Sequence, residues 1–384
     1  MAVPASDLWI KIQKDLAGKT NSEQIAIVER YLHDWPDEWK GPYQELKERL
    51  VKLLRKLQTT ESIKSSSARE DPFHVPRSGD AQVAFLGLTN SGKSALVATL
   101  TNAHLEVSDY PFTTQVPGPG MLRHKGAAIQ LVDTPAIVPG LAGGAGPGQR
   151  LVQLIRAADA IAIVVDLAQE PLEQMEVVCR ELAAANVVLL PRPVRTVLEP
   201  KGKGGIKFRG AGITKEERIA ASRMLAEHGV VHAEVIIRST FSPDELAAGL
   251  ARRRLMPALI VGNKNDVPGA GDALALLRAH YAEYVVVDVN FLDEANFDQL
   301  KTSIFDILGL VRVYVLERPT ADAPRTAVIL PRSSSIGDVV DKVRSARNEQ
   351  APLVRAWGPS AKYPGQSVGL EHLVDDGDLI RLQF

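Results

Sequence analysis

The sequence predicts an α/β protein built on a mostly parallel sheet, with a helical region before it and a small α+β domain after it. Three observations support this prediction: leucines at helical spacing before residue 58, short apolar strands that alternate with helical patterns from residue 81, and a separate pattern of strands and one helix after residue 312. Such alternation of strands and helices is typical of a parallel sheet with helices on both faces.

The composition narrows the class of protein. The 384 residues are enough for two or three domains, and the 45% hydrophobic and 24% charged fractions are ordinary for globular proteins. A net charge of -1 gives no general reason to expect nucleic-acid or membrane binding. Cys179 is the single cysteine, which excludes an internal disulfide. Without a long apolar run or a secretory signal, we expect a cytoplasmic protein and no membrane partner.

Residues 1–70 are expected to form a helical region and a linker. Residues 42–58 have one apolar and one charged face, and the apolar face carries Leu46, Leu50, Leu53, Leu54 and Leu57. We favour an amphipathic helix that packs on a neighbouring element over a helix that binds nucleic acid or a partner. The polar stretch 59–67 is interpreted as the linker.

Residues 71–311 are expected to hold the main sheet. Its predicted strands are 83–86, 129–132, 161–165, 259–261 and 285–287. An insertion at about 191–255 interrupts the pattern with a basic, glycine-rich stretch and helical segments near 214–228 and 243–254. Residues 312–384 then offer strands at 311–315 and 326–330, a helix at about 335–347 and a closing strand at 379–382, an α+β pattern of ubiquitin-like size.

The residues Gly87-Leu88-Thr89-Asn90-Ser91-Gly92-Lys93-Ser94 match the pattern G-x-x-x-x-G-K-[ST] between an apolar strand and a helix. In this motif, backbone N–H groups surround phosphates and the helix N-terminus adds positive potential. The lysine reaches the β- and γ-phosphates, and the hydroxyl binds Mg²⁺. We therefore expect Lys93 to be catalytic, Ser94 to be a metal ligand, and the nucleotide to contact Gly87, Asn90, Ser91, Gly92, Lys93, Ser94 and Ala95.

A second motif, Asn263-Lys264-Asn265-Asp266, follows the apolar strand at 259–261 and fits N-K-x-D. A carboxylate at Asp266 accepts hydrogen bonds from guanine N1–H and the exocyclic amine, a donor pair that adenine lacks. Asn263, Lys264 and Asp266 are therefore expected to bind guanine, which argues against an ATPase. The alternative for Asp266 is a helix N-cap.

A third motif, Asp133-Thr134-Pro135-Ala136, follows the strand at 129–132 and is similar to D-x-x-G. Asp133 is expected to hold Mg²⁺ through a water, and the Ala136 N–H to meet the γ-phosphate. Alanine resists backbone angles that glycine permits, which predicts a stiffer segment. Ile137 follows where a glutamine orients the attacking water in other GTPases, so intrinsic hydrolysis is expected to be slow.

Further residues resemble the Obg/DRG group of GTPases, and within it the developmentally regulated GTP-binding protein (DRG) family. The first indication is Tyr110-Pro111-Phe112-Thr113-Thr114 together with Ile137 and the glycine-rich run 139–148. The segment 73–80 is similar to the one before that family's G domain, and the insertion lies where the family has its own. Residues 310–314, 356–362 and 375–380 resemble the entry to and the end of a TGS domain.

The resemblance implies a P-loop GTPase domain with a C-terminal TGS domain, GTP/GDP and Mg²⁺ as ligands, and Thr114 as the catalytic Mg²⁺ threonine. It also implies a cytoplasmic GTPase linked to ribosomes or translation, with ribosome or RNA contact through the TGS domain and basic insertion, and a dedicated protein partner. Asn290-Phe291 stands where the family has a Ser-Ala guanine loop, so Asn290 is expected to contact the base through its amide.

Two alternatives stay open from the sequence. Asn90, three positions before Lys93, resembles the asparagine of potassium-stimulated GTPases, where K⁺ supplies positive charge near the phosphates. The other interpretation is a turn asparagine that bonds its own loop. At the level of the whole protein, the main hypothesis is a slow GTPase that acts as a nucleotide-controlled switch, and the alternative is a nucleotide-binding adaptor with little or no turnover.

Overall fold

The computed structural model describes residues 5–16, 27–28, 30–32, 35–36, 43–44, 46–47, 49–52, 73, 75–101, 117–141, 147–210, 212–291, 294–316, 326–343 and 353–383. The chain forms two compact units, Met1–His74 and Val75–Phe384. None of the helices within the described ranges is both long and apolar enough to cross a bilayer.

The first unit contains helix α1 (Ala5–Leu16) and further helical residues between 27 and 52. Its core joins Leu8 and Ile12 of α1 to Val28, Leu46 and Leu50. Leu46 and Leu50 therefore pack against a neighbour inside this unit, as the amphipathic pattern predicts. The remaining leucines of that pattern and the linker at 59–67 lie outside the described residues.

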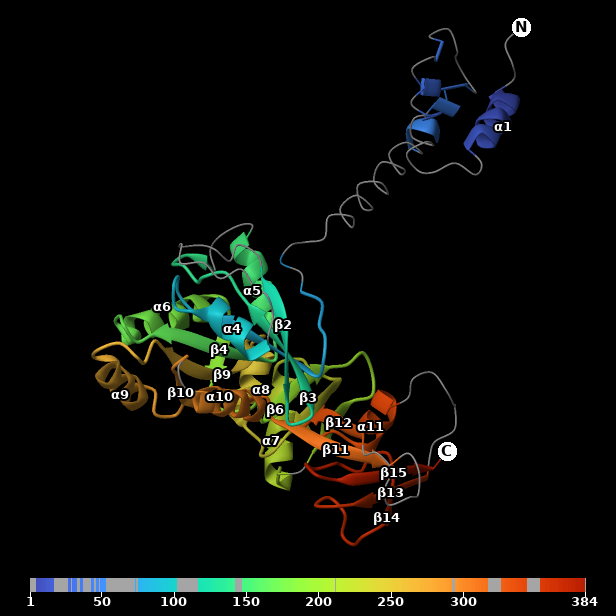
Figure 1. Ribbon diagram of the computed structural model, residues 1–384. Helices are drawn as coiled ribbons and strands as arrows, with labels where there is room; N and C mark the ends of the chain where they lie inside the picture. Colours follow the sequence, from blue (N-terminus) through green and yellow to red (C-terminus); the bar gives the residue numbers. More distant parts are fainter. Residues whose placement is uncertain are drawn as a thin grey trace. The chain divides into compact units, whose positions relative to one another are not determined.

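The main sheet of the second unit has the order β10-β9-β4-β1-β3-β2 (Figure 1). All neighbours on this path are parallel except β2, which runs antiparallel to β3. The strand at β2 was not among those predicted from the sequence. The bounds are β1 (Ala81–Leu86), β2 (Gly118–His124), β3 (Ala127–Asp133), β4 (Ala160–Asp166), β9 (Arg254–Asn263) and β10 (Val286–Val289).

Helices cover both faces of this sheet. On one face, α4 (Lys93–Thr101) and α10 (Glu294–Ile307) bury side chains such as Leu96 and Leu300 against alternate residues of the strands. The intervening strand residues face the other side, where α6 (Pro171–Ala184) contacts β4 and α9 (Ala270–His280). Helix α5 (Pro147–Ala157) precedes β4 in the chain. This is the P-loop GTPase fold that the sequence predicts.

A separate lobe is inserted between β5 (Val187–Leu190) and β9. β5 pairs with the first half of β9, and β10 pairs with its second half. The lobe has a sheet of order β6-β8-β7. Its elements are β6 (Thr196–Pro200), β7 (Ile206–Arg209), α7 (Lys215–Glu227), β8 (Ala233–Ile237) and α8 (Pro243–Leu250).

Helix α8 ends before the predicted limit of residue 254. Arg252 adopts a left-handed φ of 55°, and its N–H donates to the Gly249 carbonyl. The N–H of Arg253 donates to the Ala248 carbonyl, which closes the helix end. The chain then enters β9 at Arg254.

The C-terminal lobe is a five-stranded sheet of order β12-β11-β15-β13-β14, and helix α11 is the one helix that its described residues form. An ion pair between Arg312 and Asp376, with Nη2–Oδ2 at 2.7 Å, joins its first strand to the turn before its last. The bounds are β11 (Leu310–Leu316), β12 (Thr326–Pro331), α11 (Ile336–Val343), β13 (Leu353–Trp357), β14 (Gln366–Val368) and β15 (Leu379–Gln383).

The C-terminal lobe shares a core with the main sheet. Alternate residues of β12 face opposite sides: Val328 belongs to the core of the C-terminal lobe, whereas Ile329 belongs to the core under the main sheet. Leu310 and Ala327 also pack against the main core. The two lobes are therefore continuous through their apolar side chains.

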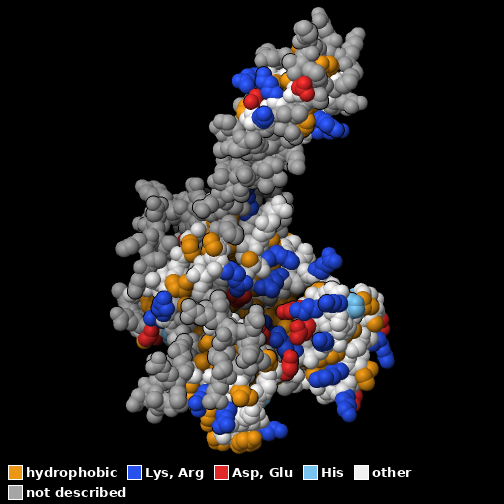
Figure 2. Space-filling model, turned by 90° about the vertical axis from the view of Figure 1, so that its right-hand side faces the viewer, with side chains coloured by type: hydrophobic (Ala, Val, Ile, Leu, Met, Phe, Trp, Pro, Cys, Tyr) orange, Lys and Arg blue, Asp and Glu red, His pale blue; other side chains and the backbone are white. Residues whose placement is uncertain are grey.

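Charged side chains are unevenly spread over the surface. The formal net charge is -1, yet Lys and Arg side chains gather on the face shown in Figure 2, with fewer Asp and Glu side chains among them. A basic surface therefore exists locally although the whole chain is nearly neutral.

The shared core makes a prediction about Ile329, whose side chain is only 2% exposed. Ile329→Ala should lower the free energy of unfolding by about 2–5 kcal/mol, because it leaves a cavity under the main sheet. Urea denaturation measures this change. Leu353→Ala, at a position 70% exposed, is the control and should change stability by about 0.5 kcal/mol or less. Equal stability of both variants would contradict a continuous core.

Candidate functional site

The parallel strands bring the sequence motifs to one edge of the main sheet. Phe85 of β1 pairs in register with Asp133 of β3, and Asp166 of β4 pairs with Asn263 of β9. Asn263 is also in register with the last residue of β10, which Asn290 follows. Ligands of open α/β sheets bind outside the carboxyl ends of the strands, so this edge is the candidate site.

The loop between β1 and α4 is held in a conformation that needs glycine. Gly92 has a φ of +89°, and a Cβ there would lie 2.0 Å from the Asn263 side-chain nitrogen. Gly87 approaches β4 so closely that a Cβ would lie 2.4 Å from the Val164 carbonyl oxygen. Such turns direct successive backbone N–H groups inward, which makes an anion-binding concavity.

Lys93 begins α4 with its ammonium group inside this loop. Its Nζ donates to the carbonyl oxygens of Leu88 at 2.7 Å and Gly87 at 3.2 Å. The residue is 7% exposed, and burial lowers the pKa of Lys93 to about 8 against the opposing effect of Asp133. The ammonium group is therefore poorly solvated, a state that a phosphate would relieve.

Ser94 and Asp133 supply adjacent oxygen atoms. The Ser94 hydroxyl donates to Asp133 Oδ2 at 2.7 Å, across the gap between α4 and β3. A hydroxyl and a carboxylate are the oxygen ligands that Mg²⁺ prefers, so this pair fits the expected metal. Ala95 follows in the first turn of α4 and is half-buried. Thr114, the third residue expected at the metal, lies outside the described residues.

Asn263 connects the two nucleotide motifs directly. Its side-chain Nδ2 donates to the Ser91 carbonyl at 2.9 Å, and both residues are buried. Lys264 adopts a left-handed φ of 63°, and its ammonium group pairs with Asp166 at 2.7 Å. The N-K-x-D turn is thus bound to the phosphate loop on one side and to the end of β4 on the other.

Asp266 lies exposed on the turn after β9. The N-cap of the next helix, α9, is Gly269, so Asp266 does not cap that helix. The turn is tied to β10, because Asn265 Nδ2 donates to Asp288 Oδ2 at 2.7 Å. Asn290 follows β10 beside this turn, and the neighbouring Phe291 ring packs edge-on against Phe297.

The segment after β3 accommodates alanine at position 136, and its expected stiffness stays a prediction. Ala136 is absent from the residues with positive φ, so its methyl group causes no backbone strain in this conformation. The Ile137 N–H donates to the Gly87 carbonyl at 3.0 Å, and the Ile137 side chain is 1% exposed. Ile137 therefore belongs to the core and offers no group to a water molecule.

Two carboxylates were missed by the sequence analysis. Asp166 holds Lys264, and Asp288 holds both Asn265 and Arg278. Both aspartates lie at the carboxyl ends of strands next to the N-K-x-D strand. The sequence did contain a signal for Asp166, because this aspartate ends a buried apolar run. A carboxylate at such a position needs a polar partner, which a neighbouring strand end can provide.

Part of the chain matches a known family model, and a larger part resembles solved structures. The family model described as 50S ribosome-binding GTPase matches residues 82–192. Among solved structures, the FeoB G-domain from Methanococcus jannaschii covers 60% of this chain and 99% of its own, with 13% identity and a TM-score of 0.34.

Sequence relatives cover most of the chain. An uncharacterized GTP-binding protein of Halobacterium salinarum is 33% identical over 86% of this chain and 90% of its own length. Developmentally-regulated GTP-binding protein 2 of Homo sapiens and Ribosome-interacting GTPase 1 of Saccharomyces cerevisiae are each 31% identical over 88% of this chain and 91% of their own lengths. With a P-loop GTPase fold, its nucleotide motifs at one sheet edge and these relatives, the chain belongs to the developmentally regulated GTP-binding protein (DRG) family.

Proposed function

We propose that the chain binds GTP and GDP with Mg²⁺ at the carboxyl edge of the main sheet and hydrolyses GTP slowly to GDP and phosphate. The main support for this proposal is the hydrogen bond from Asn263 Nδ2 to the Ser91 carbonyl, because it joins the phosphate loop to the guanine motif in one site. A ligand that carries both phosphates and guanine satisfies both halves of that site.

The phosphates contact the loop from Gly87 to Ala95. Backbone N–H groups of this loop surround them, and the ammonium group of Lys93 leaves its carbonyl partners to meet the β- and γ-phosphates. Ser94 and Thr114 would ligate Mg²⁺ and Asp133 would hold it through a water, and the metal would supply positive charge against the phosphates. We infer that the Ala136 N–H meets the γ-phosphate, which would make the segment after β3 a switch.

The base contacts the turns after β9 and β10. Asp266 accepts from the two guanine donors, and the Lys264 stem lies under the ring because Asp166 anchors its ammonium group. Asn290 contacts the base through its amide in place of the usual Ser-Ala pair.

Hydrolysis is slow because no side chain at Ala136 or Ile137 can orient the attacking water. Ile137 is buried and bonded through its backbone to Gly87, so it cannot be recruited without opening the core. The same observation favours a second candidate, a nucleotide-binding adaptor with little turnover. Phosphate release from purified protein separates the two, since an adaptor releases none above the rate of free GTP.

We propose that a monovalent cation supplies positive charge near the phosphates during hydrolysis. The Asn90 side chain is exposed at the tip of the loop and has no hydrogen-bond partner in the described part of the chain. Its left-handed φ of 62° is one that asparagine tolerates in turns, so the turn-asparagine alternative stays open beside the cation site. An amide oxygen beside the phosphates suits K⁺.

The cellular setting follows from the relatives. The Saccharomyces cerevisiae relative is named a ribosome-interacting GTPase. We propose that this chain acts in the cytoplasm, contacts the ribosome or RNA through its C-terminal TGS lobe and basic insertion, and has a dedicated protein partner.

The experiment that tests the function is Asp266→Asn. The variant should lose affinity for GTP and gain affinity for xanthosine triphosphate, because the carboxamide inverts the donor and acceptor pattern. Competition against a fluorescent nucleotide measures both affinities. Asp272→Asn, exposed on α9, is the matched control and should leave the preference unchanged. An Asp266→Asn protein that still prefers GTP removes Asp266 from the base site.

The lowered pKa of Lys93 predicts a pH dependence of nucleotide binding. Protonated Lys93 is the binding form, and the free protein loses this proton above about pH 8. Above pH 8, GDP binding must therefore return a proton to Lys93. GDP affinity should be constant below pH 8 and fall by up to about tenfold per pH unit above it. Dissociation constants between pH 7 and 9 measure this slope. The same slope in Lys93→Ala would assign the titration to another group.

The cation proposal predicts faster GTP turnover in KCl than in NaCl at equal ionic strength, which keeps general screening constant. Asn90→Gly should abolish the difference and retain GDP binding. Glycine is a better variant than alanine here, because Asn90 has a φ of 62° that alanine resists. Equal wild-type rates in both salts would leave a partner protein or the ribosome as the activator.

A further inference from the structure

A cavity lies at the edge of the main sheet opposite the proposed nucleotide site. It has a volume of about 970 Å³ and is lined by Ala81, Asp159 and Arg254, which lie at the amino-terminal ends of β1, β4 and β9. The inserted lobe and the C-terminal lobe complete its walls. β4 has 7 residues, so at roughly 3.3 Å per residue the strand separates this cavity from the proposed nucleotide site by about 20 Å.

The carboxylates of this cavity are all neutralised. It is lined by nine Arg and Lys side chains and six Asp and Glu side chains. Each of the six acids forms an ion pair with a cation. The pairs are Asp159–Arg77, Glu245–Arg192, Asp376–Arg312, Asp306–Lys125, Asp80–Lys342 and Glu199–Lys201. Two of these cations, Lys342 and Lys201, lie outside the lining.

Five arginines are left in excess. They form no ion pair with any residue in the described ranges: Arg195, Arg238, Arg253, Arg254 and Arg332. Asp159 and Glu199 act electrostatically on Arg238, and Asp159 on Arg254, but both acids already pair with other cations. The cations of the lining therefore outnumber its acids, and the cavity has a net positive charge. An anion is the ligand that such a cavity favours.

Two of these arginines are poorly solvated. Burial is the main cause that lowers the pKa of Arg238 and of Arg254. The Nε atoms of both side chains are buried and have no hydrogen-bond partner among the described residues. Arg254 Nη2 donates to the Ala158 carbonyl at 2.9 Å, so only part of its hydrogen-bonding capacity is satisfied. A buried donor without an acceptor is unfavourable, so an anion that accepts from these Nε atoms would stabilise the protein at this point.

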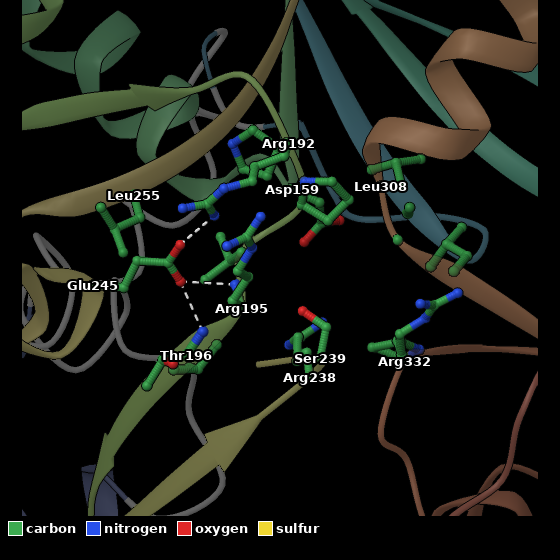
Figure 3. Close-up of a pocket in the computed structure, with 18 of the residues that line it drawn as sticks. Asp159, Arg192, Arg195, Thr196, Arg238, Ser239, Glu245, Leu255, Leu308 and Arg332 are labelled. Atoms are coloured by element: carbon green, nitrogen blue, oxygen red, sulfur yellow. Dashed lines mark hydrogen bonds and ion pairs between the residues drawn. The ribbon is translucent and has the colours of Figure 1, made fainter. Parts of the chain in front are cut away.

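The arginines come from different parts of the fold. In Figure 3, Arg195 and Arg238 of the inserted lobe and Arg332 of the C-terminal lobe lie around the same space. The Ser333 hydroxyl donates to the Arg238 carbonyl at 3.1 Å, and Arg209 pairs with Asp338 at 3.1 Å. These contacts join the two lobes beside the cavity.

We propose that this cavity binds a small phosphorylated molecule through Arg195, Arg238 and Arg332, at a site distinct from that of the guanine nucleotide. Guanidinium groups present fixed pairs of N–H donors that match phosphate oxygens. The volume is in the range of small-molecule pockets, which favours a compact ligand over a nucleic-acid strand. The bound anion connects the three lobes that form the walls.

Isothermal titration calorimetry tests the proposal with inorganic pyrophosphate as the probe. The full chain is first saturated with GDP in a constant excess of Mg²⁺, which fills the nucleotide site. Wild-type protein should bind one pyrophosphate per chain. Arg195→Ala, Arg238→Ala and Arg332→Ala should each weaken this binding by about tenfold, the size expected for a lost hydrogen bond to a charged group.

Control variants separate the cavity from general charge and from misfolding. Arg223→Ala, exposed on α7 outside the cavity, should bind pyrophosphate like the wild type. Each cavity variant should keep wild-type GDP affinity, which reports an intact fold. Arg332 is itself exposed, so its truncation tests the cavity even where loss of the half-buried Arg238 prevents folding.

Three results would overturn the proposal. The first is the absence of saturable pyrophosphate binding, and the second is unchanged binding in the cavity variants. The third is a short single-stranded RNA that binds more tightly than pyrophosphate and loses affinity in the same variants, which would make the cavity an RNA contact. The experiment rests on the GDP binding of the proposed function but not on GTP hydrolysis. A chain that fails to bind GDP contradicts the proposed function, whereas a GDP-bound chain that fails to bind pyrophosphate contradicts the cavity proposal alone.

Discussion

The parallel alignment of β3, β1, β4, β9 and β10 is the constraint on which the candidate site depends. Because these strands run in the same direction, their carboxyl ends lie at one edge, and the loops that follow them meet there. The bond from Asn263 to the Ser91 carbonyl is possible only in this register. A slip of one residue in β9 would turn Asn263 to the other face of the sheet and separate the phosphate loop from the guanine motif.

The two edges of the sheet differ in how their cations are compensated. At the carboxyl edge, Lys264 pairs with Asp166, and Lys93 is held by loop carbonyls that give weaker compensation. At the amino edge, every carboxylate of the cavity is paired, yet several arginines have no acidic partner among the described residues. Both edges therefore hold positive charge that an anion would satisfy, and the sheet itself separates the two.

The added lobes are integrated with the sheet. The insertion begins after β5 and ends at Arg254, the first residue of β9. The same strand ends in Asn263. The C-terminal lobe contributes Ile329 to the main core, and the turn between β2 and β3 approaches it, since a Cβ on Gly126 would lie 3.6 Å from that of Ala327. A change in any lobe can therefore reach the sheet through direct packing.

The sequence by itself determined the fold class, the family and the nucleotide motifs. Gly87 to Ser94 and Asn263 to Asp266 are contiguous, and their chemistry follows from local backbone geometry and residue type. The tertiary structure decided what depends on distant segments. Asp166 and Asp288 gain their roles from strand pairing, and the five uncompensated arginines come from four separate segments of the chain between Arg195 and Arg332. A single arginine has no distinctive local pattern, because its importance lies in which carboxylates are near it, and only folding sets those distances.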